Sequence, residues 1–339
     1  MINLKDLTLS QLTDFIVSIG EPKYRAKQIF AWLYKNIKSF EEMTDIPKSL
    51  IKKLKSVSFI STLEIEKCYI SQKDGTRKYL FKLPDGEFIE SVLMKYSYGY
   101  TVCVSSQVGC RMGCKFCAST LNGRKRNLSP GEIADQVMYV GEDAGVRISN
   151  IVMMGIGEPL DNYDNLLIFL ENISSEYGLN IGMRHITVST CGIADKIKEL
   201  ADQKLQITLS VSLHASSDEV RSEIMPVNKI HPIGELMKAC DYYIEKTNRR
   251  ISFEYTLIKG VNDNIGEAEK LYQLLKGKLC HVNLIPVNKV LETGFIRTQR
   301  KDAEKFCEYL SKKGISATIR REMGSDINAA CGQLRNMKR

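Results

Sequence analysis

The stretch CRMGCKFC, residues 110–117, places three cysteines at a Cys-x3-Cys-x2-Cys spacing within eight residues. Thiolates this close together favour zinc or an iron–sulfur cluster. A structural zinc site takes four Cys or His ligands, and no Cys or His occurs between residues 118 and 184. The spacing therefore predicts a metal centre with one coordination position left open, with a plain zinc site as the alternative.

Upstream of this motif the chain has two regions with different hydrophobic periodicity. Residues 1–57 have helical periodicity and many basic residues, whereas residues 62–105 alternate in the manner of β-strands. Asp74-Gly75 and Asp85-Gly86 lie between the strand-like runs as hairpin signals. We therefore expect a small helical N-terminal region followed by an antiparallel β meander.

Downstream of the motif, helix and strand patterns alternate to the end of the chain. The segment from 129 onward opens with Ser129, Pro130 and Glu132, which form a capping-box signature. Repeated βα units predict parallel strands with right-handed crossovers. Polar residues that directly follow the strands favour a full or partial (β/α) barrel; a doubly wound open sheet is the alternative.

Bulk properties limit the class of protein. The 339 residues carry no apolar run of 18, so we expect no membrane span. The N-terminus has no signal-like apolar core, which predicts a cytoplasmic protein. Ten cysteines are far fewer than a secreted disulfide scaffold contains. The net charge of +8 suits a polyanionic partner such as nucleic acid, although many enzymes are equally basic.

The cysteine motif resembles the CxxxCxxC signature of radical S-adenosylmethionine (SAM) enzymes, with Phe116 as the aromatic residue before the last cysteine. Further motifs resemble one family within that superfamily, the RlmN/Cfr family of RNA adenine methyltransferases. In chain order they are CVSSQVGC (103–110), RNLSPGEI (126–133), VMMGIGEPLDN (152–162), SVSLHA (210–215), NLIPVN (283–288) and DINAACGQL (326–334).

The resemblance implies a partial (β/α)6 barrel of the TIM type. It divides the chain into a helical RNA-contacting domain (1–60), a β-meander extension (61–98) and a radical SAM core (99–335) that includes a C-terminal segment with a methyl-carrier cysteine.

The resemblance also implies a 4Fe–4S cluster with one open iron and two SAM molecules per turnover. Cys110, Cys114 and Cys117 match the cluster ligands. The cofactor-contacting positions of the family match Gly157, Glu158, Ser189, Ser212, Leu213, His214 and Asn288. Each of these lies near the end of a predicted strand, which agrees with where barrel enzymes build their sites.

Three further residues match the catalytic positions of the family. Cys331 matches the cysteine that is methylated first and then carries the methyl group. Cys103 matches its resolving partner, so the family implies a Cys103–Cys331 disulfide after each turnover. Glu90 matches the proposed proton acceptor. Without the resemblance, Cys103 would be read as a buried strand thiol and Glu90 as an exposed strand carboxylate.

The implied reaction is methylation of carbon 2 of an adenosine in 23S rRNA, near the peptidyl-transferase centre, and of an anticodon-loop adenosine in tRNA. A flavodoxin or ferredoxin would donate electrons to a monomeric enzyme. Basic residues near the motif and at the C-terminus are candidate phosphate contacts: Arg124, Lys125, Arg126, Arg335, Lys338 and Arg339. The alternatives are a Cfr-type methyltransferase acting on carbon 8, which Pro159 disfavours, and a non-catalytic zinc- and RNA-binding protein.

Overall fold

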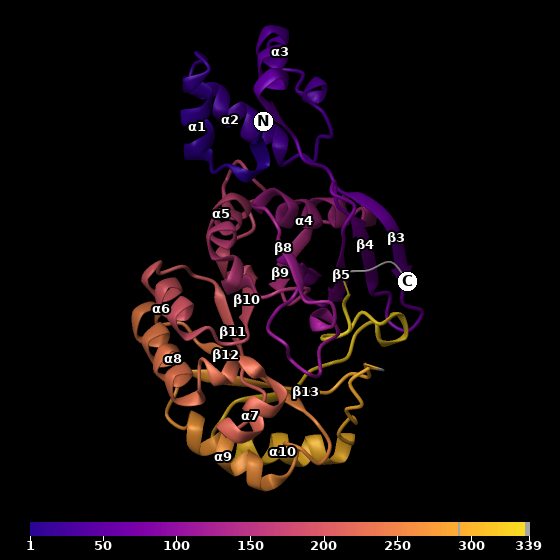
Figure 1. The fold of residues 1–339 in the computed structure, drawn as a ribbon, viewed down its shortest axis with the longest axis vertical. Helices are drawn as coiled ribbons and strands as arrows, with labels where there is room; N and C mark the ends of the chain where they lie inside the picture. The colour runs from indigo at the N-terminus through magenta and orange to yellow at the C-terminus, as the bar shows by residue number, and fades with distance from the viewer. Residues whose placement is uncertain (291, 336–339) are drawn as a thin grey trace.

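The computed structural model describes residues 1–290 and 292–335. Helices α1, α2 and α3 lie together at one end of the molecule (Figure 1). The side chain of Thr8 and that of Gln11 cap the start of α1 reciprocally. The strands of a short parallel pair, β1 and β2, flank the helices in sequence. The bounds are β1 Ile2–Asn3, α1 Leu9–Ser18, α2 Tyr24–Leu33, α3 Lys48–Val57 and β2 Ser58–Phe59.

The predicted antiparallel meander forms one side of a ten-stranded sheet. The turns at Gly75 and Gly86 join its first three strands, and both glycines have a positive φ. The last strand of the meander is antiparallel to its predecessor and parallel to the strand on its other side. The meander strands are β3 Glu64–Ile70, β4 Arg77–Lys82, β5 Phe88–Tyr96 and β6 Gly99–Cys103.

The other side of the sheet is parallel and starts from β6. Its strands neighbour one another in the order in which they occur along the chain. A doubly wound sheet reverses its strand order at a switch point, so this sequential order identifies the partial barrel and rules out the alternative. The strands are β9 Ile148–Met153, β10 Ile186–Thr190, β11 Thr208–Ser212, β12 Ile251–Leu257, β13 Cys280–Pro286 and β14 Ala317–Ile319.

Helices follow the parallel strands as the βα pattern predicts (Figure 1). The capping box expected from Ser129 and Glu132 is present at the start of α4. A separate antiparallel pair, β7 (Gln107–Gly109) and β8 (Arg124–Asn127), brackets the cysteine motif. The helices are α4 Pro130–Ala144, α5 Tyr163–Ser174, α6 Ala194–Asp202, α7 Asp218–Ile224, α8 Ile233–Thr247, α9 Ile265–Leu275 and α10 Arg300–Lys312.

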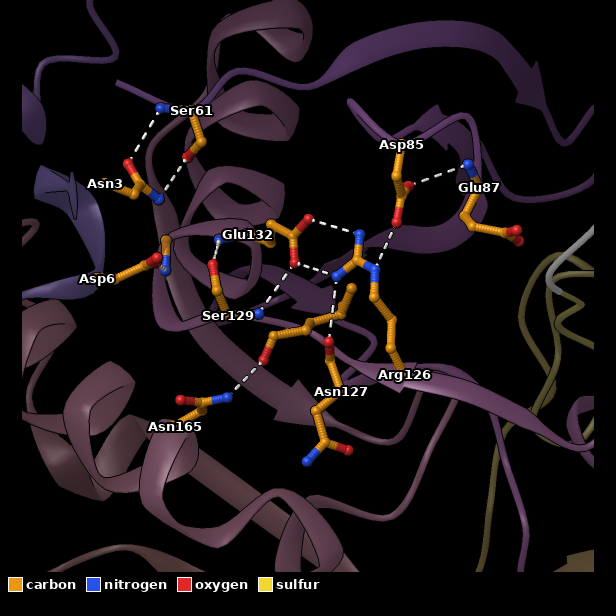
Figure 2. A network of polar contacts seen from close by, with 12 residues as sticks. Asn3, Asp6, Ser61, Asp85, Glu87, Arg126, Asn127, Ser129, Glu132 and Asn165 are labelled. Carbon is orange, nitrogen blue, oxygen red and sulfur yellow. Dashed lines mark hydrogen bonds and ion pairs between the residues drawn. The ribbon is translucent and has the colours of Figure 1, made fainter. Parts of the chain in front are cut away.

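One hydrophobic core runs from the N-terminal helices into the barrel, and it includes Phe30, Phe169 and Phe253. Polar contacts also join these regions. Figure 2 shows the amide of Asn3 bonded to Ser61, with a distance of 3.1 Å between the two side chains. Asp6 accepts a hydrogen bond from the backbone N–H of Gly131 in α4. Among the described helices, none is long and apolar enough to cross a membrane.

Candidate active site

The cysteine motif forms a tight loop between β7 and β8. Gly109 has a φ of +76°, and a Cβ there would lie 1.9 Å from the carbonyl oxygen of Gly123. The backbone N–H of Cys117 bonds to the carbonyl oxygen of Cys114 over 3.1 Å. All three cysteines of the motif line a single cavity, which we call the cofactor cavity. Only a glycine at position 109 lets the strands approach closely enough to fold the loop in this way.

The three thiols suit a multi-iron cluster. Burial raises the pKa of Cys110 to about 12 and that of Cys114 well above its usual value. Such thiols lose their protons when iron binds, because metal charge stabilises the thiolate. Among the described residues, no three His, Cys, Asp or Glu side chains are grouped so that they could hold a single metal ion. Three thiols on one loop match the soft-ligand shell that an iron–sulfur cluster takes.

Glu158 lies on the wall of the cofactor cavity, just after β9. Its buried carboxylate accepts hydrogen bonds from the backbone N–H groups of Leu160, over 3.0 Å, and Cys191, over 2.6 Å. Burial raises the pKa of Glu158 above its usual range. Gly157 precedes it with a φ of +108° and packs directly against Gln107. This loop therefore presents a fixed carboxylate whose remaining lone pairs suit an amine.

The other predicted cofactor-contacting residues come from neighbouring strand ends. Ser189 on β10, Ser212 on β11, His214 and Asn288 all line the cofactor cavity. Leu213 lies between two of them in sequence, but its side chain belongs to the hydrophobic core. The carboxyl ends of parallel strands meet at one end of a barrel, which explains why distant segments converge here.

His214 has a defined tautomer. Its Nδ1 accepts a hydrogen bond from the backbone N–H of Thr256 over 3.0 Å, so its proton is on Nε2. Burial, together with the nearby Arg221 guanidinium, lowers the pKa of His214 to about 3. The rings of Phe116 and His214 pack in a T-shaped arrangement, with centroids 5.0 Å apart and an interplanar angle of 85°. The imidazole is therefore neutral, and its Nε2–H can donate a hydrogen bond.

The segment that carries Cys331 is attached to the cysteine loop. The backbone N–H of Ala118, next to Cys117, bonds to the carbonyl oxygen of Gly332 over 2.8 Å. The side-chain amide of Asn288 donates to the carbonyl oxygen of Cys331 over 3.0 Å. These contacts hold Cys331 against the cofactor cavity, although it follows the motif by more than 200 residues.

A second cavity adjoins the first, and we call it the thiol-pair cavity. It is lined by both Cys103 and Cys331, and Cys331 also lines the cofactor cavity. Cys103 is buried at the end of β6, and burial raises its pKa to about 12. Both cysteines are free thiols here, so the implied disulfide is not formed in this structure. Cys331 alone among the described cysteines lines both cavities.

Glu90 lines neither cavity. It points from β5 to a buried ion pair, in which its Oε1 lies 2.9 Å from Nζ of Lys78. Its Oε2 accepts a hydrogen bond from the backbone N–H of Arg335 over 2.8 Å. The structure therefore brings Cys103 and Cys331, the two cysteines predicted to be catalytic, to one cavity but keeps Glu90 out of that cavity, where it anchors the C-terminal segment.

Two charged residues that line the cofactor cavity were not predicted from the sequence. Glu254 on β12 lines the cofactor cavity and accepts hydrogen bonds from Ser210 and Asn283, each over 2.7 Å. Arg320 directly follows β14 and lines both cavities. Its guanidinium lies 3.7 Å from Glu254. Arg320 could have been predicted, because barrel sites form at strand ends. Glu254 could not, because in the sequence it looks like any other residue of an alternating strand.

The basic residues next to the motif are neutralised internally. Figure 2 shows the guanidinium of Arg126 between the carboxylates of Glu132 and Asp85. Arg124 pairs with Asp161 over 2.7 Å, and Lys125 pairs with Glu87 over 2.7 Å. These pairs shape the β7–β8 loop and reduce its expected use as a phosphate contact. Arg335 pairs with Glu292, while Lys338 and Arg339 lie outside the described residues.

Two family descriptions match the chain. Residues 104–275 match the Radical SAM superfamily. Residues 2–60 match the Ribosomal RNA large subunit methyltransferase N-terminal domain. The first match begins next to Cys103 and includes the whole cysteine motif.

Curated relatives and a solved structure resemble the chain over its full length. The chain is 57% identical over 335 residues to a probable dual-specificity RNA methyltransferase RlmN of Clostridium botulinum (strain Alaska E43 / Type E3), covering 99% of this chain and 96% of the relative. A protein of the same name from Thermoanaerobacter sp. (strain X514) is 54% identical, with 99% and 98% covered. A radical SAM methyltransferase from Sphaerobacter thermophilus has a TM-score of 0.93 at 44% identity, with 99% of both chains covered.

Proposed function

Since the chain belongs to the RlmN family of radical SAM RNA methyltransferases, we propose that it methylates carbon 2 of adenosine in two RNAs. One is an adenosine of 23S rRNA near the peptidyl-transferase centre, and the other is an anticodon-loop adenosine of tRNA. The full-length relatives named dual-specificity RNA methyltransferase support two substrates. The observation that carries the mechanism is the position of Cys331 between the two cavities.

The enzyme uses a 4Fe–4S cluster and SAM, as the radical SAM superfamily does. Cys110, Cys114 and Cys117 would hold the cluster through three irons. Gly157 and Glu158 would bind the amino acid end of SAM, and Ser189, Ser212, His214 and Asn288 would hold its remainder. Leu213 would support them from the core side of the cavity wall. When bound, these cofactors supply a methyl group and, from a second SAM, a radical that removes a hydrogen atom.

Cys331 acts as the methyl carrier. Its thiolate would take the methyl group of SAM and become an S-methyl thioether, with S-adenosylhomocysteine as the leaving group. After one hydrogen atom is removed from that methyl group, the resulting carbon radical on Cys331 bonds to carbon 2 of adenine. A carrier is needed because carbon 2 is electron-poor and cannot itself attack a sulfonium methyl. The contacts of Asn288 and Ala118 with the Cys331 segment support this role, since they hold the sulfur beside the cofactor cavity.

Cys103 releases the product. The radical adduct first loses its ring proton at carbon 2 and one electron, which the cluster, oxidised when it supplied the electron that cleaved SAM, would take back. The Cys103 thiolate then attacks the Cys331 sulfur, and the Cys331 sulfur–carbon bond breaks. The electron pair of that bond moves to the methylene carbon, which takes up a proton and becomes the new methyl group. The resulting disulfide is then reduced by external thiols. We propose Glu90 as the acceptor of the ring proton, a role that requires its hydrogen bond with the Arg335 N–H to open.

The decisive experiment replaces Cys331 by alanine. We expect Cys331→Ala to bind its full complement of iron and to produce no methylated RNA, because the cluster does not depend on the carrier. Intact mass analysis of the wild-type protein should show one added methyl group, localised to Cys331 by peptide mapping. Sustained methylation by Cys331→Ala would refute the carrier mechanism.

The position of the methyl group separates this proposal from the Cfr-type alternative. Pro159 and the relatives named RlmN favour carbon 2. Mass spectrometry of rRNA from cells with and without the protein should place the new methyl group on carbon 2. A methyl group only on carbon 8 would overturn this assignment. We further propose that the enzyme works in the cytoplasm as a monomer, with a flavodoxin or ferredoxin as its electron donor.

A further inference from the structure

Two tyrosines are stacked at the tip of the hairpin between β5 and β6. Tyr96 is the last residue of β5 and pairs with Gly99, while Tyr98 lies in the turn between them. Their ring centroids are 5.1 Å apart, and the ring planes differ by only 4°. The backbone of the turn is tight, since Gly99 has a φ of +122° and packs against Ser149. The stack is therefore a defined element of the hairpin.

The stacked pair of tyrosines extends from the thiol-pair cavity to the solvent. Tyr96 lines the thiol-pair cavity together with Cys103 and Cys331. Tyr98 covers Tyr96 and is itself 66% exposed. An aromatic face that is open to water beside a cavity for a nucleobase is a ready stacking surface, because bases stack on tyrosine with little regard to sequence.

The rim of the same cavity carries positive charge from Arg297, Arg320 and Arg321. Arg297 is paired with Glu322 over 2.9 Å, and Arg320 faces Glu254. The exposed Arg321 has no ion pair in the part of the chain that the structure describes. Its guanidinium is thus available to a phosphate group at the cavity mouth.

We propose that Tyr98, backed by Tyr96, stacks against the nucleotide that flanks the target adenosine, with Arg321 binding the adjoining phosphate. This inference rests on the proposed function, because it needs the target adenine to lie beside Cys331. Tyr98 lies on the solvent side of Tyr96, so a base on its open face is a neighbour of the target and not the target itself. Stacking of this neighbour offsets the loss of base stacking when the target is flipped out.

The test uses a single-stranded RNA that contains the target adenosine flanked on one side or the other by 2-aminopurine, whose fluorescence is quenched by stacking. With one of the two RNAs, wild-type protein should quench the fluorescence on binding. Tyr98→Ala should bind about tenfold more weakly and lose the quenching. Tyr98→Trp should retain both, because it keeps a stacking ring. Arg321→Gln should lower the slope of log binding constant against log salt concentration by about one, the effect of losing one phosphate contact.

Leu279→Ala is the control, since Leu279 is 49% exposed but precedes β13, at the other end of the barrel strands. It should bind both RNAs as the wild type does. Wild-type affinity and quenching by Tyr98→Ala would overturn the inference. The S-methyl group on Cys331 of RNA-free wild-type protein reports separately on the proposed function, so failure of one idea is distinguishable from failure of the other.

Discussion

The cofactor cavity and the thiol-pair cavity share a wall but are built in different ways. The cofactor cavity is formed by the ends of successive parallel strands: Ser189 comes from the βα unit of β10, and Ser212 and His214 come from that of β11. The thiol-pair cavity combines an antiparallel hairpin with the C-terminal segment. The repeated βα units thus form the cofactor site. The hairpin and the C-terminal segment, at the edge of the barrel, form the site that we propose for methyl transfer to RNA.

The two cavities also differ in the way that they hold charge. The cofactor cavity contains buried thiols, the carboxylate of Glu158 and a neutral imidazole. The rim of the thiol-pair cavity is rich in arginine. The first arrangement suits a cluster and a zwitterionic cofactor, whereas the second suits a polyanion. Cys331 and Arg320 line both cavities, so these residues connect the two.

Removal of a proposed cluster ligand should have the largest effect, because the reactions proposed for both cavities require the cluster. We expect Cys114→Ala to lose most of its iron and its brown colour, and to lack the methyl group on Cys331. Iron and sulfide analysis under anaerobic conditions checks the first point, and intact mass checks the second. Cys307→Ala is the matched control, since Cys307 lies on α10 away from both cavities. Full iron in Cys114→Ala would contradict the ligand assignment.

Removal of Cys103 should stop only the chemistry of the thiol-pair cavity. Cys103→Ala should keep its cluster and the methyl group on Cys331 but accumulate a covalent protein–RNA adduct, because nothing cleaves the bond to Cys331. A denaturing gel with labelled RNA should show the adduct and no further turnovers. Cys68→Ala, on β3, should behave like the wild type. Release of free methylated RNA by Cys103→Ala at the normal rate would exclude a resolving role.

The smallest expected effect is on the pH dependence of the free energy of unfolding, and it comes from the neutral His214 in the cofactor cavity. The folded protein keeps the pKa of His214 at about 3, whereas an exposed histidine has a pKa of 6.5. The unfolded state therefore takes up a proton first, and the free energy of unfolding falls as the pH falls from 6.5 toward 3. Between pH 6.5 and pH 5 the loss should be about 1.5 kcal/mol.

Urea unfolding at several pH values measures this loss. His214→Gln should remove that part of the pH dependence, because glutamine does not titrate. The other histidines act as a common background in both proteins. An identical pH dependence in His214→Gln and the wild type would show that His214 is solvated in the folded state, contrary to its buried position.

Much of the cofactor cavity could be predicted from the sequence. The motif at Cys110 is local, and the strand-end positions of Ser189, Ser212 and Asn288 follow from periodicity together with the family resemblance. Glu254 could not be predicted, because an alternating strand does not reveal which end of its face opens into a cavity. The place of Glu90 is likewise a tertiary result: its role depends on Lys78 and on the returning C-terminal segment.

By itself the sequence determined the alternation of helices and strands, the positions of the turns and the three-thiol motif, since each is encoded by residues close together in the chain. Only the tertiary structure decided that Cys331 lies beside both Cys103 and the cysteine loop, and that Arg124, Lys125 and Arg126 pair with acidic residues. The physical reason is that these contacts join segments remote in sequence, so they exist only once the sheet has packed.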